Sequence, residues 1–469
     1  MSVDVGSAAH ALARVAAPRP DIAATALVQQ PAAIPGPVHG VTAETFVPSL
    51  QLAALGLPVH AQALVGEYAF ANRLDGATES RQPKEQPAPP GFDDPQLAND
   101  WWTGLPQSER DRYITQYPEM VGAEDGLPLE DRDRANQILI DEEVAGLDAE
   151  LDASGEFLVQ LNDDRARAEA EGNWSEVARL DGQISLLEDH IADVTAEKNY
   201  YLWLGGTQFT DAAPGVPTDD HDGGAPIPPP DTVILFKGNG GRNDRIVLAW
   251  GDPSTAGNVT TLVPGANSDA RYESYSEDAW ELHEETNGDP GYATVLWVDY
   301  DPPNDDAGQL APWDTIRTGA LETGGGSAVH IAEDGARELD RYYDGLGVLN
   351  PDSRHVLVTH SYGTIVASEL FEHYEGVPVD DVVMIGSPGS ASEPGEWLSR
   401  PDVHVIVNDD DSTAAAGEYF AVHAPSTWDE AAQHRGEGGH GLPEYLDPAS
   451  GAGTDTRARI GEIIRGEDD

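Results

Sequence analysis

The sequence predicts an α/β fold, in which a mainly parallel sheet is flanked by helices and preceded by a helical region. The first indication is a series of short apolar runs, rich in β-branched residues, that alternate with helical stretches in the second half of the chain. The second is that several of these runs are continuously apolar, as expected for strands buried on both faces of a sheet. The third is a helical apolar periodicity between residues 99 and 204.

Changes in composition divide the 469 residues into four regions. Residues 1–98 are rich in alanine and proline and are predicted to form an accessory or partly disordered N-terminal region. Residues 99–209 form the helical region, and residues 210–231, which contain many prolines and glycines, form a linker or a long surface loop. Residues 232–469 contain the alternating strands and helices and are predicted to form the α/β core.

The helical region contains two apolar stripes with a spacing of three or four residues, separated by a glycine-containing break at 171–173. This pattern predicts an antiparallel helical hairpin. We expect the hairpin to pack on itself or on the adjacent core, and binding of a protein partner is the alternative. The stripes consist of Val144, Leu147, Leu151, Leu158 and Leu161, and of Trp174, Val177, Leu180, Ile184, Leu187, Ile191 and Val194.

The core is predicted to begin with two antiparallel strands within 233–249, followed by a mainly parallel set. Helices are predicted at 327–345 and 363–375, between the later strands. Alternation of strand and helix is typical of a parallel sheet with helices packed on it.

The composition excludes several classes of partner and site. With 26 basic and 84 acidic residues, the formal net charge is −58. Such a surface repels nucleic acids and anionic membranes, so neither is expected as a partner. The absence of cysteine excludes disulfides, thiolate catalysis and zinc-thiolate sites.

The sequence contains no apolar run long enough for a transmembrane helix. The first twenty residues lack the charged and apolar segments of a secretory signal. The expected location is therefore the cytoplasm, and export by a route that needs no such signal is the alternative.

Residues 359–363, Thr-His-Ser-Tyr-Gly, lie between an apolar strand pattern and an amphipathic helix pattern. A serine on a sharp strand-to-helix turn has its Oγ projected outward, as in the G-x-S-x-G nucleophile elbow. Gly363 supplies the small residue needed two positions later, whereas Thr359 is bulkier than the usual glycine. The pattern predicts that Ser361 is a nucleophile; a serine that only caps the helix is the alternative.

A serine nucleophile needs a base that is oriented by an acid, and in folds with this elbow the chain order is Ser, Asp or Glu, His. Three aspartates, residues 409–411, follow the mainly apolar run at 403–407. Asp411 is the predicted acid and Asp410 the second choice. His440 is the predicted base because its glycine-rich surroundings allow the ring to reach a serine. His434 and His423 are the alternatives.

An oxyanion hole requires two backbone N–H groups that point at the developing charge. The predicted donors are Tyr362, directly after the nucleophile, and Ala266, in a loop where Gly265 lets the backbone approach the substrate. Gly265, Tyr300 and His360 are predicted to line the substrate pocket.

No cofactor or metal is expected. The glycine-rich stretch at 237–244 lacks the G-K-[ST] sequence of a phosphate-binding loop and is predicted to be a turn. The sequence contains neither an H-E-x-x-H motif nor the pattern of an EF-hand loop.

Six stretches of the sequence are distinctive in combination: Trp102 to Leu105, Tyr117 to Pro128, Arg132 to Asn136, 248–265, 297–303 and 360–364. Together they resemble a family of bacterial α/β-hydrolases of undefined function, widespread in high-GC Gram-positive bacteria and with a GHSYG-type nucleophile elbow. The resemblance covers about residues 99–465.

The chain departs from this family at three positions. Thr359 replaces a glycine, Ser412 replaces a proline after the acid, and extra residues separate His440 from Tyr445. The resemblance implies an α/β-hydrolase catalytic core at 232–469 and a Ser-Asp-His site, without a known substrate. The segment Val121 to Pro128 is expected either to wall the pocket or to bury an edge or face of the sheet.

Together, the motifs predict a serine hydrolase that acts on a small-molecule or lipid-like ester through an acyl-enzyme on Ser361. Two alternatives are a non-catalytic binding or scaffold protein on a hydrolase fold, for which Thr359 is an indication, and an exported effector.

Overall fold

The computed structural model describes most of the chain after residue 86, and the outer part of the predicted N-terminal region lies outside it. The ranges described are 87–219, 224–238, 245–266, 273–302, 327–390, 392, 394–415, 425–429, 431–436, 438–446 and 453–467.

An eight-stranded sheet, in the order β10-β9-β8-β7-β5-β6-β4-β3, forms the centre of the fold. The pairs β3–β4 and β4–β6 are antiparallel and the other neighbouring strands are parallel, which confirms the predicted antiparallel start. The strands are β3 (Thr232–Lys237), β4 (Arg245–Trp250), β5 (Asn258–Val263), β6 (Tyr292–Val298), β7 (Arg354–His360), β8 (Asp381–Ile385), β9 (Asp402–Asn408) and β10 (Ala432–Gly436).

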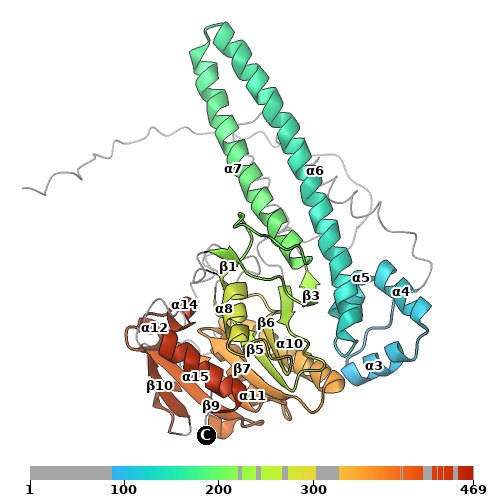
Figure 1. Ribbon diagram of the computed structural model, residues 1–469, viewed down its shortest axis with the longest axis vertical. Helices are drawn as coiled ribbons and strands as arrows, with labels where there is room; N and C mark the ends of the chain where they lie inside the picture. Colours follow the sequence, from blue (N-terminus) through green and yellow to red (C-terminus); the bar gives the residue numbers. More distant parts are fainter. Residues whose placement is uncertain are drawn as a thin grey trace, which may run out of the picture. The chain divides into compact units, whose positions relative to one another are not determined.

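Helices cover both faces of the sheet (Figure 1). Successive residues of β7 point to opposite faces of the sheet. On one face, Leu357 belongs to an apolar core that includes residues of α10 (Ser327–Leu349) and α11 (Gly363–His373). Val356 and Val358 belong to the second core, with residues of α8 (Glu273–Glu284) and α15 (Gly453–Arg465). The strands are therefore buried on both sides, as their continuous apolar sequences predict. Shorter elements are α12 (Ser412–Ala415), α14 (Leu442–Leu446), η3 (Pro394–Glu396) and η4 (Pro425–Thr427).

The predicted helical hairpin is present. Helices α6 (Leu129–Ala170) and α7 (Trp174–Leu204) lie side by side and are joined at 171–173 (Figure 1). Asn173 caps α7 by accepting a hydrogen bond from the Glu176 N–H. Near the turn, apolar residues of the two helices form a separate small core: Leu161, Ala168, Val177, Leu180, Ile184 and Leu187.

Helix α6 begins earlier than its apolar stripe predicts, and polar contacts as well as the buried Leu129 and Ala135 hold its first turns. Asp133 accepts a hydrogen bond from the Val233 N–H at 2.9 Å, and the Asn136 side chain donates one to the Val233 carbonyl at 2.8 Å. Val233 lies at an irregularity in the register of β3, the outermost strand. The two side chains thus satisfy backbone groups at an edge that would otherwise be open.

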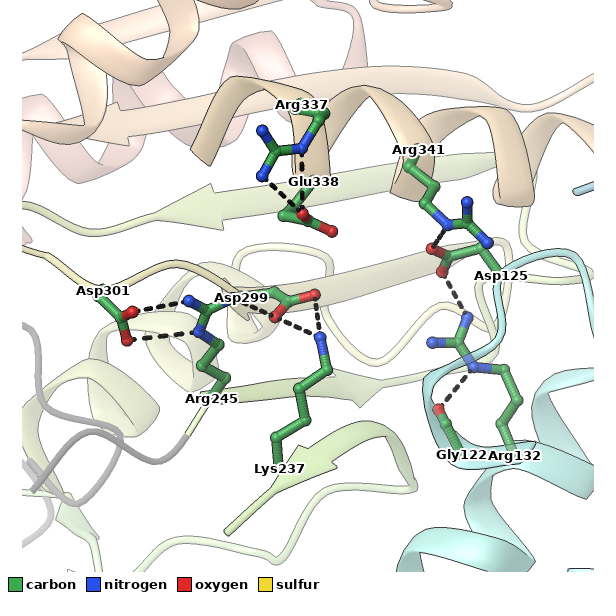
Figure 2. A network of polar contacts seen from close by, with 10 residues as sticks. All are labelled: Gly122, Asp125, Arg132, Lys237, Arg245, Asp299, Asp301, Arg337, Glu338 and Arg341. Carbon is green, nitrogen blue, oxygen red and sulfur yellow. Dashed lines mark hydrogen bonds and ion pairs between the residues drawn. The ribbon is translucent and has the colours of Figure 1, made fainter. Parts of the chain in front are cut away.

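The segment Val121 to Pro128 also docks at this edge. Asp125 accepts hydrogen bonds from Arg132 of α6 and from Arg341 of α10 (Figure 2). Helix α5 (Pro118–Ala123) packs on α6 and β3. Of the two roles considered for this segment, these contacts correspond to covering the sheet edge. Helices α3 (Pro95–Thr103) and α4 (Gln107–Gln116) precede α5; α3 packs on α10, and α4 packs on α5 and α6.

The described part of 210–231 packs against the rest of the protein. Its strands β1 (Thr218–Asp219) and β2 (Ala225–Pro226) pair antiparallel. Val216 and Ile227 are buried in the second apolar core. None of the helices in the described part of the chain combines the length and the apolar character needed to span a lipid bilayer.

Candidate active site

Ser361 lies on a sharp turn between the end of β7 and the start of α11. Its φ of 50° falls in the left-handed region, which a residue other than glycine seldom adopts. The Ser361 N–H donates to the Ile385 carbonyl of β8 at 3.0 Å, and the Ser361 carbonyl accepts from the Thr364 N–H at 3.0 Å. These bonds hold the strained residue in place, which is typical of a nucleophile elbow.

The residues two positions before and after the serine show how this sharp turn packs against the neighbouring strands. A Cβ added to Gly363 would lie 2.4 Å from the Val263 carbonyl oxygen, so this position has no room for a side chain. Thr359 is fully buried, and its hydroxyl donates to the Val383 carbonyl at 3.1 Å. The bulkier residue is therefore accommodated with its polar group satisfied.

His440 lies against the nucleophile. Its Nε2 is 2.9 Å from the Ser361 Oγ, and its Nδ1 is 2.9 Å from one Asp411 oxygen and 3.0 Å from the other. Because a carboxylate only accepts, the imidazole Nδ1 carries hydrogen and the Nε2 of the neutral ring is free to accept the serine proton. His434 lies on β10 with its ring stacked on His404, and His423 lies outside the described residues.

The Asp411 carboxylate is buried and accepts several hydrogen bonds. Besides His440, the donors are the Tyr445 hydroxyl at 2.6 Å and the N–H groups of Thr413 and Ala414 at 2.9 and 2.8 Å. Burial alone would raise the pKa of Asp411, but the hydrogen bonds outweigh it and the pKa lies below its usual value. Asp410, the second choice for the acid, is exposed.

No role was predicted for two residues beside the acid. Tyr445 is buried and places its hydroxyl between Asp411 and the Asn408 N–H, from which it accepts at 3.1 Å. Gly386, with a φ of 55°, follows β8; an added Cβ would lie 2.9 Å from Asp411 Oδ2 and 3.3 Å from His440 Nδ1. The glycine after the strand and the tyrosine five residues after His440 are the only signals that the sequence carries for them.

The loop after β5 approaches the nucleophile closely. A Cβ added to Gly265 would lie 2.7 Å from the Ser361 Cβ and 3.2 Å from the Tyr362 nitrogen. Ala266, the predicted second oxyanion donor, follows directly and packs on the apolar core. Only glycine allows this approach.

Tyr300, which was predicted to line the pocket, is buried behind this loop. Its hydroxyl donates to the Pro264 carbonyl at 2.8 Å, and its ring stacks on that of Tyr362. The residues on either side of Tyr300 are held by cations: Asp299 by Lys237, and Asp301 by Arg245 (Figure 2). These contacts fix the end of β6 beside the loop.

His360, also predicted to line the pocket, is buried next to the nucleophile. Its Nε2 is 2.8 Å from the His440 carbonyl oxygen. The centroids of the two imidazole rings are 5.2 Å apart.

Within the described residues, one group of side chains has the spacing of metal ligands: Glu369, Glu372 and His373, all on α11. His373 Nε2 is 3.0 Å from a Glu369 carboxylate oxygen. Since exposed and paired acidic groups are common without a metal, this group does not indicate one.

Residues 240–417 match a family model described as alpha/beta hydrolase. The fold is the α/β-hydrolase fold. The match contains Ser361 and Asp411 and ends before His440.

Known relatives do not add an activity. An uncharacterized protein of Mycobacterium tuberculosis is 27% identical over 332 residues, which are 68% of this chain and 43% of that protein. A second uncharacterized protein of that organism is 31% identical over 143 residues, 29% of this chain and 46% of that one. The chain thus spans less than half the length of these curated relatives. Among solved structures, the esterase LipW from Mycobacterium marinum aligns with 13% identity and a TM-score of 0.34, over 59% of this chain and 87% of that one.

Proposed function

We propose that the protein is a serine hydrolase that cleaves carboxylic esters through an acyl-enzyme on Ser361. The observation that carries the proposal is the continuous contact from the Ser361 Oγ through the His440 imidazole to the Asp411 carboxylate. This is the arrangement in which a histidine activates a serine and a carboxylate orients the histidine.

In the proposed reaction, Ser361 Oγ attacks the ester carbonyl while His440 Nε2 takes its proton. The tetrahedral intermediate collapses, and the same proton passes from His440 to the leaving alkoxide, which departs as an alcohol. Water, deprotonated by His440, then attacks the acyl-serine, and the returned proton restores Ser361 as the carboxylic acid leaves. No cofactor is required for these steps.

The electrostatics of Asp411 support this role. Because hydrogen bonds hold its pKa below the usual value, the carboxylate stays ionised at neutral pH. An ionised acid keeps hydrogen on His440 Nδ1 and stabilises the imidazolium that forms in each step.

The proposed oxyanion hole consists of the N–H groups of Tyr362 and Ala266. The close approach of Gly265 to Ser361 and to the Tyr362 nitrogen supports it, since it brings the loop after β5 next to the reacting centre. Donors aimed at the developing oxyanion are worth about 10²–10³ in kcat each.

A fluorophosphonate probe tests the proposal, because it reacts covalently with activated serines. We expect the wild-type protein to be labelled and to hydrolyse p-nitrophenyl esters of some chain length, and Ser361→Ala to do neither. Ser368→Ala is the matched control: Ser368 lies on α11, is buried, and donates to the Ile365 carbonyl. Absence of labelling and of hydrolysis in the wild-type protein would reject the proposal in favour of a binding protein on this fold.

A wider set of substrates tests which bond the protein cleaves and which acceptor takes the acyl group. Esters, thioesters and amides of matched chain length would show which bond is cleaved, and addition of an alcohol acceptor would reveal acyl transfer. The indication for a non-catalytic protein was Thr359, whose hydroxyl is hydrogen-bonded within the fold. That residue therefore does not favour a decayed site.

A further inference from the structure

His360 occupies a position that the proposed reaction does not use. It is the last residue of β7, directly before Ser361, and its side chain is buried. Its Nε2 lies 2.8 Å from the backbone carbonyl oxygen of His440. A carbonyl only accepts hydrogen bonds, so the Nε2 of His360 carries hydrogen and donates it.

The imidazole of His360 is neutral at physiological pH. Burial, followed by the proximity of His440, lowers the pKa of His360 to about 4. With one proton on the ring and that proton on Nε2, the Nδ1 is a buried acceptor, and it has no hydrogen-bond partner among the described residues. The polar contact that the ring makes is therefore directed at the backbone of His440.

Other hydrogen bonds to the backbone of residues 438 and 439 come from a different part of the fold. The Asp410 N–H donates to the Gly438 carbonyl at 3.1 Å, and the Asn408 side chain donates to the Gly439 carbonyl at 3.3 Å. The Glu444 carboxylate accepts from the Gly439 N–H. Asn408 ends β9, Asp410 follows it and Glu444 lies in α14, whereas His360 ends β7, directly before the nucleophile.

We propose that His360 is a positioning residue that fixes the distance between the nucleophile and the base, an inference that rests on the proposed serine hydrolase function. The hydrogen bond joins the residue before Ser361 to the backbone of His440. The positions of Ser361 Oγ and His440 Nε2 are thereby both fixed relative to the same end of β7. A displacement of about 1 Å in such an arrangement costs about 100-fold in rate.

The test compares His360→Leu, which removes the donor, with His360→Gln, whose amide nitrogen reaches about as far as Nε2. Hydrolysis of a p-nitrophenyl ester that the wild-type protein accepts gives kcat and KM. We expect His360→Leu to lower kcat about 100-fold with KM nearly unchanged, and His360→Gln to retain most of the activity. The rate of fluorophosphonate labelling should fall in parallel with kcat.

His355 provides a matched control on the same strand. It is buried, its pKa is lowered to about 4, and its Nε2 contacts the Ser353 hydroxyl at 2.9 Å, near the opposite end of β7. His355→Leu should lower the melting temperature by an amount similar to His360→Leu and leave kcat of the folded protein unchanged. A purely structural role for His360 would make the two variants behave alike.

The outcomes separate this inference from the proposed function. An inactive, unlabelled wild-type protein rejects the function itself. An active wild-type protein whose His360→Leu variant keeps kcat within threefold rejects the role of His360. If His360→Leu does not fold, His360→Asn replaces it, since its amide is too short to reach the His440 carbonyl; equal kcat in the Asn and Gln variants would then reject the proposal.

Discussion

Two buried aspartates in this protein have opposite surroundings. Asp411 and Asp278 are 1% and 2% exposed. Asp411 accepts hydrogen bonds from His440, Tyr445 and two backbone N–H groups, and its pKa is lowered. Asp278, on α8, has an Oδ2 atom without a hydrogen-bond partner among the described residues, and burial raises its pKa well above the usual value.

The difference shows that donors, and not depth, decide whether a buried carboxyl is charged. At Asp411, α12 supplies two backbone N–H donors, α14 supplies the Tyr445 hydroxyl, and the loop before α14 supplies the His440 ring. Around Asp278 the nearby charges are those of Glu281 and Glu277, which raise its pKa further. Hydrogen bonds at the first site favour the charged carboxylate that catalysis would need, and burial at the second site favours the neutral acid.

Asp411→Asn should have the largest effect. The amide cannot hold hydrogen on His440 Nδ1 in the way a carboxylate does, so the ring adopts the wrong tautomer for accepting the serine proton. We expect kcat to fall by about 10³–10⁴-fold, measured on a p-nitrophenyl ester. Asp410→Asn, at the exposed neighbouring residue, is the control and should stay within about twofold. Comparable losses in both variants would mean that the acid was misassigned.

Tyr445→Phe should have the next largest effect, because it removes one donor from Asp411 and the acceptor of the Asn408 N–H. We expect kcat to fall about tenfold and the free energy of unfolding to fall by about 1–3 kcal/mol, the cost of an unsatisfied buried group. Urea unfolding and ester hydrolysis measure the two effects.

The direction in which the pKa of Asp411 is shifted predicts how the stability of Tyr445→Phe depends on pH. The pKa of Asp411 is lower in the folded than in the unfolded protein, so its ionised form contributes stability above the unfolded pKa, and this is lost as pH falls through the folded pKa. The variant has a smaller shift, so the gain in stability between acidic and neutral pH should be smaller. An unchanged pH dependence would show that Tyr445 does not act on Asp411.

The sequence permits prediction of the features that depend on short stretches of chain. The strand, turn and helix around Ser361 are contiguous, Asp411 follows a strand, and His440 lies in a glycine-rich loop, so each was recognisable locally. The start of α6 lies well before the apolar stripe that predicts the hairpin. Asp133 and Asn136 help to hold it through polar contacts with Val233, about a hundred residues later, and such contacts leave no periodic signal in the sequence.

The role of Tyr445 and the burial of Asp278 were not predicted, for a related reason. The role of Tyr445 depends on a contact with a residue 34 positions away. The unpaired Oδ2 of Asp278 depends on which donors the described residues place around it, and periodicity carries no information about that. Its place in an amphipathic acidic helix is typical of a solvated residue.

Asp278→Asn should increase stability at neutral and alkaline pH. The pKa of Asp278 is raised in the folded protein, so above the unfolded pKa the unfolded state releases a proton that the folded state retains, and stability falls as pH rises. An amide carries no such cost. We expect a gain of about 1–2 kcal/mol at pH 8 that shrinks toward pH 4, measured by urea unfolding. A loss of stability at pH 8 would mean that Asp278 is ionised and paired.

Glu281→Gln should have the smallest effect, because two consequences oppose each other. Removing this charge lowers the pKa of Asp278 and reduces the pH dependence that it causes. It also takes away the Glu281 contact with Arg457, at 3.6 Å, although Arg457 keeps its contacts with Glu284 and Glu285. We expect a net change within about 1 kcal/mol at pH 8 and a flatter stability curve between pH 5 and 8.

Glu277→Gln is the control for that last variant. Glu277 also raises the pKa of Asp278, by less than Glu281 does, and the contacts of Arg457 described above do not involve it. Its stability curve should flatten less than that of Glu281→Gln. If neither variant changes the curve, carboxylate repulsion contributes little at α8, and the contrast with Asp411 comes from burial that the described donors do not offset at Asp278.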